Sequence, residues 1–182
     1  MKKFELTAEF VTNVFGKKLF RIKALVAFGN VEKGELGGFI EKEDNLSHDG
    51  DAWVSGNAQV SGNARVCGDA RVCGNAQVSG NAQVYGNAQV FGNAQVFGNA
   101  DYAVVAGFGR YFRTTTFFRC KDKILRVQCG CFYGDLAQFR EIVKKTHGDS
   151  KYAKEYLAIA DLMELHFSDK CGGEQMNDGK IY

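Results

Sequence analysis

The chain has 182 residues, enough for one or two small domains, and a formal net charge of only +2. So small a charge gives no ground for nucleic-acid or membrane binding by the whole molecule, and any such function must rest on a local patch. No run of about 18 apolar residues occurs, and Glu5 interrupts the start before a secretory leader can form. We therefore expect a cytoplasmic protein with reduced cysteines.

The first 49 residues predict an N-terminal β cap. Apolar and polar residues alternate over 4–10 and 19–25, with turn-forming residues between the two stretches. This is the pattern of a β-hairpin. Residues 36–41 then lead into the six-residue repeat that follows.

Residues 50–103 are nine consecutive six-residue repeats of the form G-[ND]-A-x-V-x. The valine and alanine are expected to point inward, and the glycine with Asn or Asp to form a corner, because these residues tolerate positive φ. Three faces of six residues complete a turn in 18 residues. The turn predicts three stacks: Val54 with Val72 and Val90, Val60 with Val78 and Val96, and Val66 with Val84 and Tyr102.

This spacing predicts a mainly β fold built on a short parallel β-helix of three turns, about 15 Å tall. We expect a left-handed helix, although spacing alone does not fix the hand; hairpin-rich sheets and right-handed helices rarely keep an uninterrupted count of six. The end coils carry unpaired backbone groups and need caps. The flanking segments are expected to supply them.

The residue after each valine should point outward, and near the end of the repeat three of these positions are aromatic: Tyr85, Phe91 and Phe97. They would place one aromatic ring on each of three successive faces. One interpretation is an interface in a homo-oligomer, a trimer or a dimer. The other is burial beneath the chain's own C-terminal module.

Residues 104–167 predict an α+β C-terminal module. Residues 114–118 and 124–129 have the composition of strands. Asp135 is suited to begin a helix over 136–146.

Gly148 is suited to end that first helix, and a second one is expected over 150–167. Its spacing of apolar residues gives one packing face, made of Tyr152, Tyr156, Ile159 and Met163. Residues 168–182 are mostly polar and are expected to form a flexible tail.

Residues 107–126 carry six basic side chains against a single acidic one, Asp122. Guanidinium forks and hydroxyls can hold phosphate oxygens, so this segment predicts a ligand-binding site. The alternative is a strand face in contact with solvent whose aromatic residues lie in the core. The predicted site residues are Arg110, Arg113, Thr114, Thr115, Thr116, Arg119 and His147.

Six-residue β-helices often belong to acyltransferases, which use a histidine base. The repeat contains no histidine, so an acyltransferase would have to use His48 or His147, and a lone histidine is more often structural. Cys129 and Cys131 lack the paired C-x-x-C spacing of a metal site. We therefore predict no catalytic residue, no metal and no cofactor.

Segments on both sides of the repeat carry a family resemblance: LGGFIE at 36–41, NLS at 45–47, TTTFFR at 114–119, GCF at 130–132 and THGD at 146–149. Nearly the whole chain resembles small hexapeptide-repeat proteins of phages and prophages of low-GC bacteria, often labelled polymer-forming or hexapeptide transferase-like. That label follows the repeat and offers no catalytic residue to carry over.

The resemblance implies a phage setting, in which we expect a non-catalytic, oligomeric protein that counters bacterial defence. It would sequester a nucleotide-derived immune signal, a phosphate-bearing small ligand, or occlude a defence protein such as a CRISPR effector. The repeat has too few carboxylates to mimic DNA, and no direct DNA binding is expected. The alternatives are a hexapeptide-repeat acyltransferase and a self-assembling structural scaffold.

Overall fold

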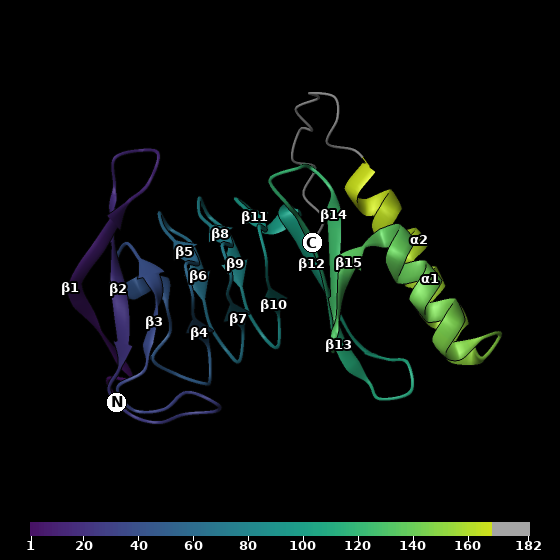
Figure 1. The fold of residues 1–182 in the computed structure, drawn as a ribbon, viewed down its shortest axis with the longest axis horizontal. Helices are drawn as coiled ribbons and strands as arrows, with labels where there is room; N and C mark the ends of the chain where they lie inside the picture. Colours follow the sequence, from purple (N-terminus) through teal and green to yellow (C-terminus); the bar gives the residue numbers. More distant parts are fainter. Residues whose placement is uncertain (169–182) are drawn as a thin grey trace, which may run out of the picture.

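In the computed structural model, which describes residues 1–168, the chain runs from an N-terminal hairpin through stacked coils to a sheet and two helices (Figure 1). Three parallel ladders of short strands form the coils. Neither helix combines the length and apolar character needed to cross a membrane.

The N-terminal sheet continues directly into one face of the coils. Strands β1 (Phe4–Thr12), β2 (Lys18–Ala24) and β3 (Leu36–Ile40) are antiparallel, which confirms the predicted hairpin. Strand β3 was not predicted from the sequence. It pairs in parallel with the second short strand of the repeat, with Ile40 opposite Val60. The cap and the repeat therefore share one sheet, in which β3 is followed by β5 (Gln59–Val60), β8 (Gln77–Val78) and β11 (Gln95–Val96).

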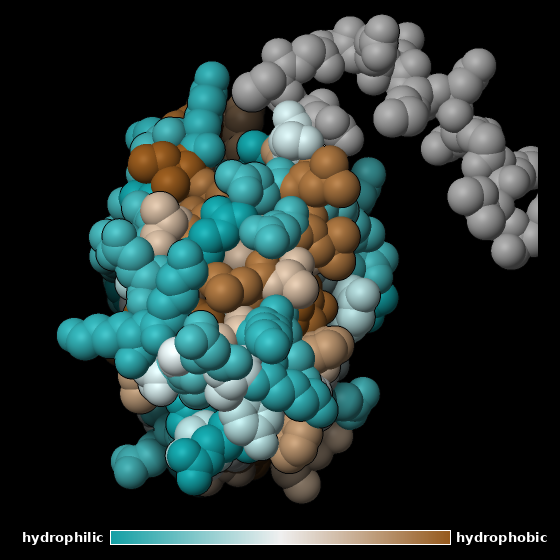
Figure 2. Space-filling view, turned by 90° about the vertical axis from the view of Figure 1, so that its right-hand side faces the viewer, coloured by the Kyte–Doolittle hydropathy of each residue, from teal (hydrophilic) through white to brown (hydrophobic). Residues whose placement is uncertain are grey.

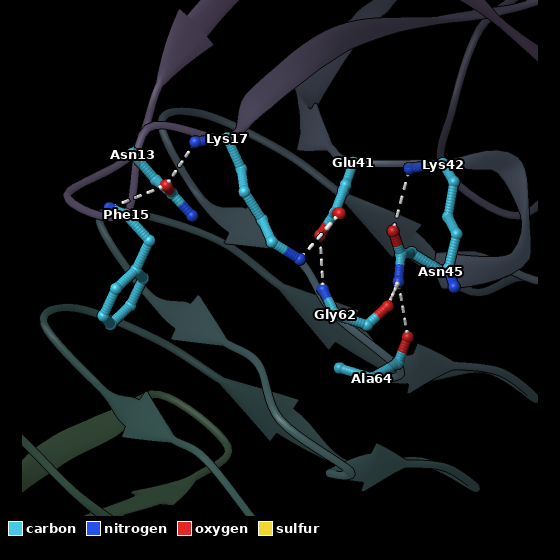
Figure 3. A network of polar contacts seen from close by, with 8 residues as sticks. All are labelled: Asn13, Phe15, Lys17, Glu41, Lys42, Asn45, Gly62 and Ala64. Atoms are coloured by element: carbon cyan, nitrogen blue, oxygen red, sulfur yellow. Dashed lines mark hydrogen bonds and ion pairs between the residues drawn. The ribbon is translucent and has the colours of Figure 1, made fainter.

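Polar side chains fasten this cap to the first coil (Figure 3). Asn45, in the short 3-10 turn Glu43–Asn45, donates from Nδ2 to the carbonyls of Gly62 (3.2 Å) and Ala64 (2.8 Å). Glu41 accepts the N–H of Gly62 at 2.6 Å and forms an ion pair with Lys17 at 2.9 Å. These bonds satisfy backbone groups of the first coil that a further coil would otherwise pair.

The repeat forms a parallel β-solenoid of three turns, which confirms the predicted fold; its hand stays a prediction. Val72 pairs with both Val54 and Val90, Val78 with both Val60 and Val96, and Val66 with Val84. Every repeat valine and alanine up to Val96 is fully buried. The strands are β4 (Trp53–Val54), β5 (Gln59–Val60), β6 (Arg65–Val66), β7 (Arg71–Val72), β8 (Gln77–Val78), β9 (Gln83–Val84), β10 (Gln89–Val90) and β11 (Gln95–Val96).

The ninth repeat does not continue the parallel ladder, so the backbone of Tyr102 does not pair with that of Val84, although its ring takes the predicted inward position. Residues Asn99–Asp101 form a 3-10 turn, in which the Asp101 carboxylate accepts the N–H groups of Phe97 and Gly98. The backbone of Tyr102 then pairs with Phe118 in an antiparallel ladder. Its ring stays in the solenoid core, with the hydroxyl donating to the carbonyl of Gln83.

The C-terminal module is an antiparallel sheet in the order β12-β13-β14-β15, followed by two helices. The two predicted strands and both predicted helices are confirmed, and β12 and β15 are additional. Asp135 caps the first helix by accepting the N–H of Gln138 at 2.8 Å, and Gly148, with φ of +55°, ends it. The elements are β12 (Tyr102–Phe108), β13 (Arg113–Arg119), β14 (Leu125–Cys129), β15 (Phe132–Asp135), α1 (Leu136–His147) and α2 (Lys151–Ser168).

The sheet stands between the last coil and the helices (Figure 1). Phe118 belongs to the solenoid core, whereas the adjacent Phe117 belongs to the core beneath the helices. On the predicted packing face of α2, all but Tyr152 are buried. The predicted tail begins at Ser168, which ends α2, and its residues 169–182 lie outside the described part of the chain.

Candidate functional site

Strand β13 divides the predicted ligand site between its two faces. Thr116 is fully buried toward the solenoid, where its hydroxyl accepts the N–H of Gln89 at 3.0 Å. Thr115 is buried toward the helices, 3.2 Å from the sulfur of Cys129. Both hydroxyls are therefore internal, and the expectation that they bind a ligand is wrong.

Two further predicted residues lie apart from the others. Thr114 lines a groove beside Tyr85 on the solenoid side. Arg119, at the end of the strand, donates to the carbonyl of Phe167 and lies over its ring, 5.3 Å from the centroid. Successive side chains of a strand alternate between its faces, so the run of arginines and threonines cannot form a single site.

The structure does bring Arg110, Arg113 and His147 together, at a half-open pocket of about 200 Å³. The pocket lies where the turns of the sheet meet α1 and α2. Its remaining lining residues are Tyr111, Cys129, Cys131, Phe132, Phe139, Ile142, Val143, Thr146 and Tyr156.

The charge of this pocket is positive. The guanidinium groups of Arg110 and Arg113 lie 5.5 and 5.0 Å from the ring centroid of Tyr111, which holds both beside the opening. No carboxylate is among the described residues that line the cavity. The rim is therefore suited to an anion.

The inner wall of the pocket is aromatic. The ring of Tyr156 stacks on His147 with centroids 5.8 Å apart and meets the edge of Phe139 at 5.8 Å. Phe132 packs on Phe139 at 5.6 Å. Burial raises the pKa of Tyr156 to about 12, so its hydroxyl keeps its proton near neutral pH, and that hydroxyl donates to the carbonyl of Phe108 at 3.5 Å.

Two glycines with positive φ make room for these side chains. A Cβ at Gly130 would lie 2.4 Å from a guanidinium nitrogen of Arg113, and one at Gly109 would lie 2.2 Å from the hydroxyl of Tyr156. The Gly109 N–H also donates to Glu155 at 2.9 Å. The turn that carries Arg110 is thus fixed to α2.

Sequence reasoning missed the aromatic wall of the pocket. Tyr156 was expected only as a packing residue of the second helix, and Phe132 and Phe139 were not considered as ligand contacts. The helical spacing identified the buried face but not the cavity at its end. Ile142 of α1, which lines this cavity, is partly exposed, and Leu162 and Leu165 of α2 are exposed as well. Figure 2 shows apolar side chains gathered on one face of the molecule.

The three outward aromatics lie on separate columns of the solenoid, as predicted from the turn of 18. Tyr85 and Phe97 are 61% and 49% exposed, whereas Phe91 is half-buried against the core. Their role as a subunit interface stays a prediction.

The other candidate residues are placed as follows. The ring of His48 stacks on Phe4 at 4.4 Å, and its Nδ1 accepts the N–H of Lys3 at 3.2 Å, so it packs the N-terminal cap. Cys129 and Cys131 line the pocket. Within residues 1–168, no three potential metal ligands gather at one point.

Comparison with known proteins bears on the solenoid. A family model described as the YdcK β-solenoid repeat matches residues 58–74, 64–80, 70–86, 76–90 and 82–98. A search of curated proteins found no match. The matched windows lie within the coils and do not reach the pocket. The chain thus contains a β-solenoid repeat of this kind, and its C-terminal module must be interpreted from its own geometry.

Proposed function

We propose that this chain is a non-catalytic binding protein, in which the solenoid is the scaffold and the C-terminal pocket recognises a small anion with an aromatic group. One observation carries the proposal: Arg110 and Arg113 stand at the rim of a cavity whose inner wall is aromatic. Such a pocket offers charge-assisted hydrogen bonds to phosphate and stacking surfaces to a base.

The size of the pocket narrows the ligand class. Its volume of about 200 Å³ is below the roughly 300 Å³ at which pockets for drug-sized ligands begin. It accommodates one ring system, with any charged group left at the mouth. A mononucleotide, or one nucleotide of a larger molecule, has this arrangement.

The sequence resemblance supplies a setting for this activity. We propose a phage protein that acts in the cytoplasm of the bacterial host and counters defence by sequestering a nucleotide-derived signal. A ligand-sized pocket favours sequestration over occlusion of a defence protein, since occlusion requires no cavity.

Calorimetric titration with adenosine and guanosine monophosphates tests the proposal, with inorganic phosphate as a further probe. Arg113→Gln should weaken nucleotide binding by roughly 10- to 100-fold, because charge-assisted hydrogen bonds contribute about 1.5–3 kcal/mol. Arg65→Gln is the matched control, since Arg65 is exposed on a solenoid strand. Absence of binding to either nucleotide, or an equal loss in both variants, would contradict the pocket assignment.

The acyltransferase alternative has one candidate base in the pocket, His147. Release of free thiol from acetyl-coenzyme A in the presence of the protein, abolished in His147→Ala, would overturn the non-catalytic proposal. We expect no such release from either protein.

A further inference from the structure

Positive charge continues beyond the mouth of the pocket. Glu155 of α2 accepts the N–H of Gly109 at 2.9 Å through one oxygen and pairs with Lys151 at 3.5 Å through the other. Lys151 therefore lies near the turn that carries Arg110, and its side chain is 82% exposed. Residues 144–154, which include the end of α1 and the start of α2, contain four lysines against a single acidic residue.

The basic side chains gather at one end of the C-terminal module. Farther along the helices, Arg140 of α1 is held between the carboxylates of Asp161 and Glu164, at 2.7 Å from each. The loop between β12 and β13 and the loop between α1 and α2 both lie at the end where the pocket opens (Figure 1). This end is therefore suited to a ligand that carries more than one negative group.

Two aromatic rings stand exposed on the turn between Arg110 and Arg113. Tyr111 lines the pocket and is 62% exposed, and Phe112 is 72% exposed. Phe112 also has a φ of +52°, a left-handed conformation that favours glycine or asparagine over a bulky side chain. Neither burial nor turn geometry accounts for a phenylalanine at this position. An exposed ring between two guanidinium groups is a stacking surface for a nucleic-acid base.

We propose that the ligand is a short single-stranded oligonucleotide, of which the pocket holds one nucleotide. This inference rests on the proposed nucleotide pocket and extends it outward. One base enters the aromatic cavity, and a neighbouring base stacks on Phe112. The phosphates between and beyond these bases follow the two rim arginines toward Lys151. Aromatic platforms beside a cationic track are the means by which proteins hold single strands without reading their sequence.

A duplex does not suit this site. The bases of a double helix are paired and stacked, so none can enter a cavity unless it is first extruded. The cavity of about 200 Å³ has room for one ring system, and an exposed ring needs a free base face. The site is therefore expected to select unpaired strands. Phosphodiester charge with free bases is common to RNA and single-stranded DNA.

Fluorescence anisotropy of the full-length chain with a labelled adenine hexanucleotide tests the proposal, and competition by adenosine monophosphate gives the affinity of a single nucleotide. The hexanucleotide should bind about 10-fold more tightly or better, because it adds a stacked base and further phosphates. Phe112→Ala should weaken hexanucleotide binding by roughly 5- to 100-fold and leave the monophosphate affinity unchanged. Phe112→Tyr should retain the wild-type affinity. Phe15→Ala is the matched control, because Phe15 is 79% exposed on the β1–β2 turn.

The salt dependence of binding tests the path of the phosphates. For single strands the logarithm of the affinity falls with the logarithm of the salt concentration by about 0.7 for each phosphate neutralised. Lys151→Gln should therefore reduce this slope by about 0.7. Lys33→Gln, an exposed position in the N-terminal cap, should leave it unchanged. Equal slopes in all three proteins would overturn the phosphate path.

The outcomes separate this inference from the pocket itself. A hexanucleotide that binds no more tightly than the monophosphate would overturn the inference and leave the pocket intact, as would a folded Phe112→Ala with unchanged hexanucleotide affinity. Hexanucleotide binding that is unaffected by Arg113→Gln would contradict the pocket assignment instead. RNA and DNA strands of one sequence are compared, and binding of either supports the proposal. A duplex that binds as tightly as the single strand would overturn it. Far-ultraviolet circular dichroism establishes that each variant is folded.

Discussion

Buried polar side chains close the N-terminal end of the solenoid core. The ammonium of Lys3, only 3% exposed, donates to the carbonyls of Gly50 (3.1 Å) and Ala52 (2.9 Å). Asn45, fully buried, does the same for Gly62 and Ala64. Each side chain bonds to carbonyls that a further coil would otherwise pair. The loss of either side chain is therefore expected to lower the free energy of unfolding more than the loss of an exposed polar side chain would.

Asn45→Ala tests whether this side chain stabilises the end coil. The buried carbonyl of Ala64, the partly buried carbonyl of Gly62 and the N–H of Lys42 lose their partner, which should lower the free energy of unfolding by about 1–3 kcal/mol. Asn63→Ala is the control, because its exposed side chain donates to Asn81 at 3.2 Å and caps no buried carbonyl, and its effect should stay within about 0.5 kcal/mol. Urea unfolding measures both, and equal effects would contradict the capping role.

Glu41 should make part of this stability depend on pH. The N–H of Gly62, followed by the ion pair with Lys17, lowers the pKa of Glu41 from its ordinary value of 4.5. A lowered carboxyl pKa adds stability that is complete above 4.5 and is lost as pH falls through the folded-state value. Glu41→Gln should therefore melt below the wild type near neutral pH, and the gap should narrow in acid. A gap in melting temperature that is independent of pH would contradict this.

At the scale of the element, the corner glycines of the repeat are not equivalent. Gly80 and Gly86 have nearly the same φ, +64° and +62°. A Cβ at Gly80 would lie 2.3 Å from the carbonyl oxygen of Phe97, whereas one at Gly86 would meet no described atom within 4 Å. The first corner is covered by the next turn of the chain, and the second is open.

Alanine at these two corners separates steric contact from backbone strain. Both variants incur about 1–2 kcal/mol for the left-handed conformation. In Gly80→Ala, the clash with the coil should lower the free energy of unfolding by a further ~1–3 kcal/mol. Thermal unfolding followed by circular dichroism compares them, and an equal loss in the two variants would show that coil contact has no part.

The repeat could be predicted residue by residue because its period imposes one geometry. The turn of 18 residues places Val72 between Val54 and Val90, and no tertiary information is needed. The ninth repeat departed from this because Asp101 turns the chain, and its sequence matches the consensus closely enough to conceal the change. Strand β15 was missed because it is short and contains Gly134.

The candidate site was only partly predictable for a related reason. An excess of arginine in one segment was recognised, but β13 sends alternate side chains to opposite faces. Thr115 and Thr116 therefore serve two different cores. The pocket depends on Phe139 and Tyr156, which reach it from the helices, and linear sequence does not place helices on a sheet.

At the scale of the whole molecule, β13 joins two hydrophobic cores. Phe118 closes the end of the solenoid, and Phe117 packs under the helices. Loss of the C-terminal module would expose the last coil, so the two cores are expected to unfold together.

Phe117→Ala tests this coupling, because truncation of a fully buried phenylalanine costs about 3–5 kcal/mol. The only tryptophan, Trp53, reports on the first coil, and circular dichroism reports mainly on α1 and α2. Both signals should shift to the same lower urea midpoint. A shift confined to circular dichroism would mean that the cores unfold independently.

We propose that the solenoid is a scaffold and that recognition belongs to the pocket between the sheet and the helices. Nuclear magnetic resonance of the ¹⁵N-labelled protein, titrated with guanosine monophosphate, tests it most directly. We predict amide shifts confined to 109–113, 129–132, 139–147 and the neighbourhood of Tyr156, the segments that line the pocket. Shifts along the coils of 50–98 with none in those segments would contradict the account.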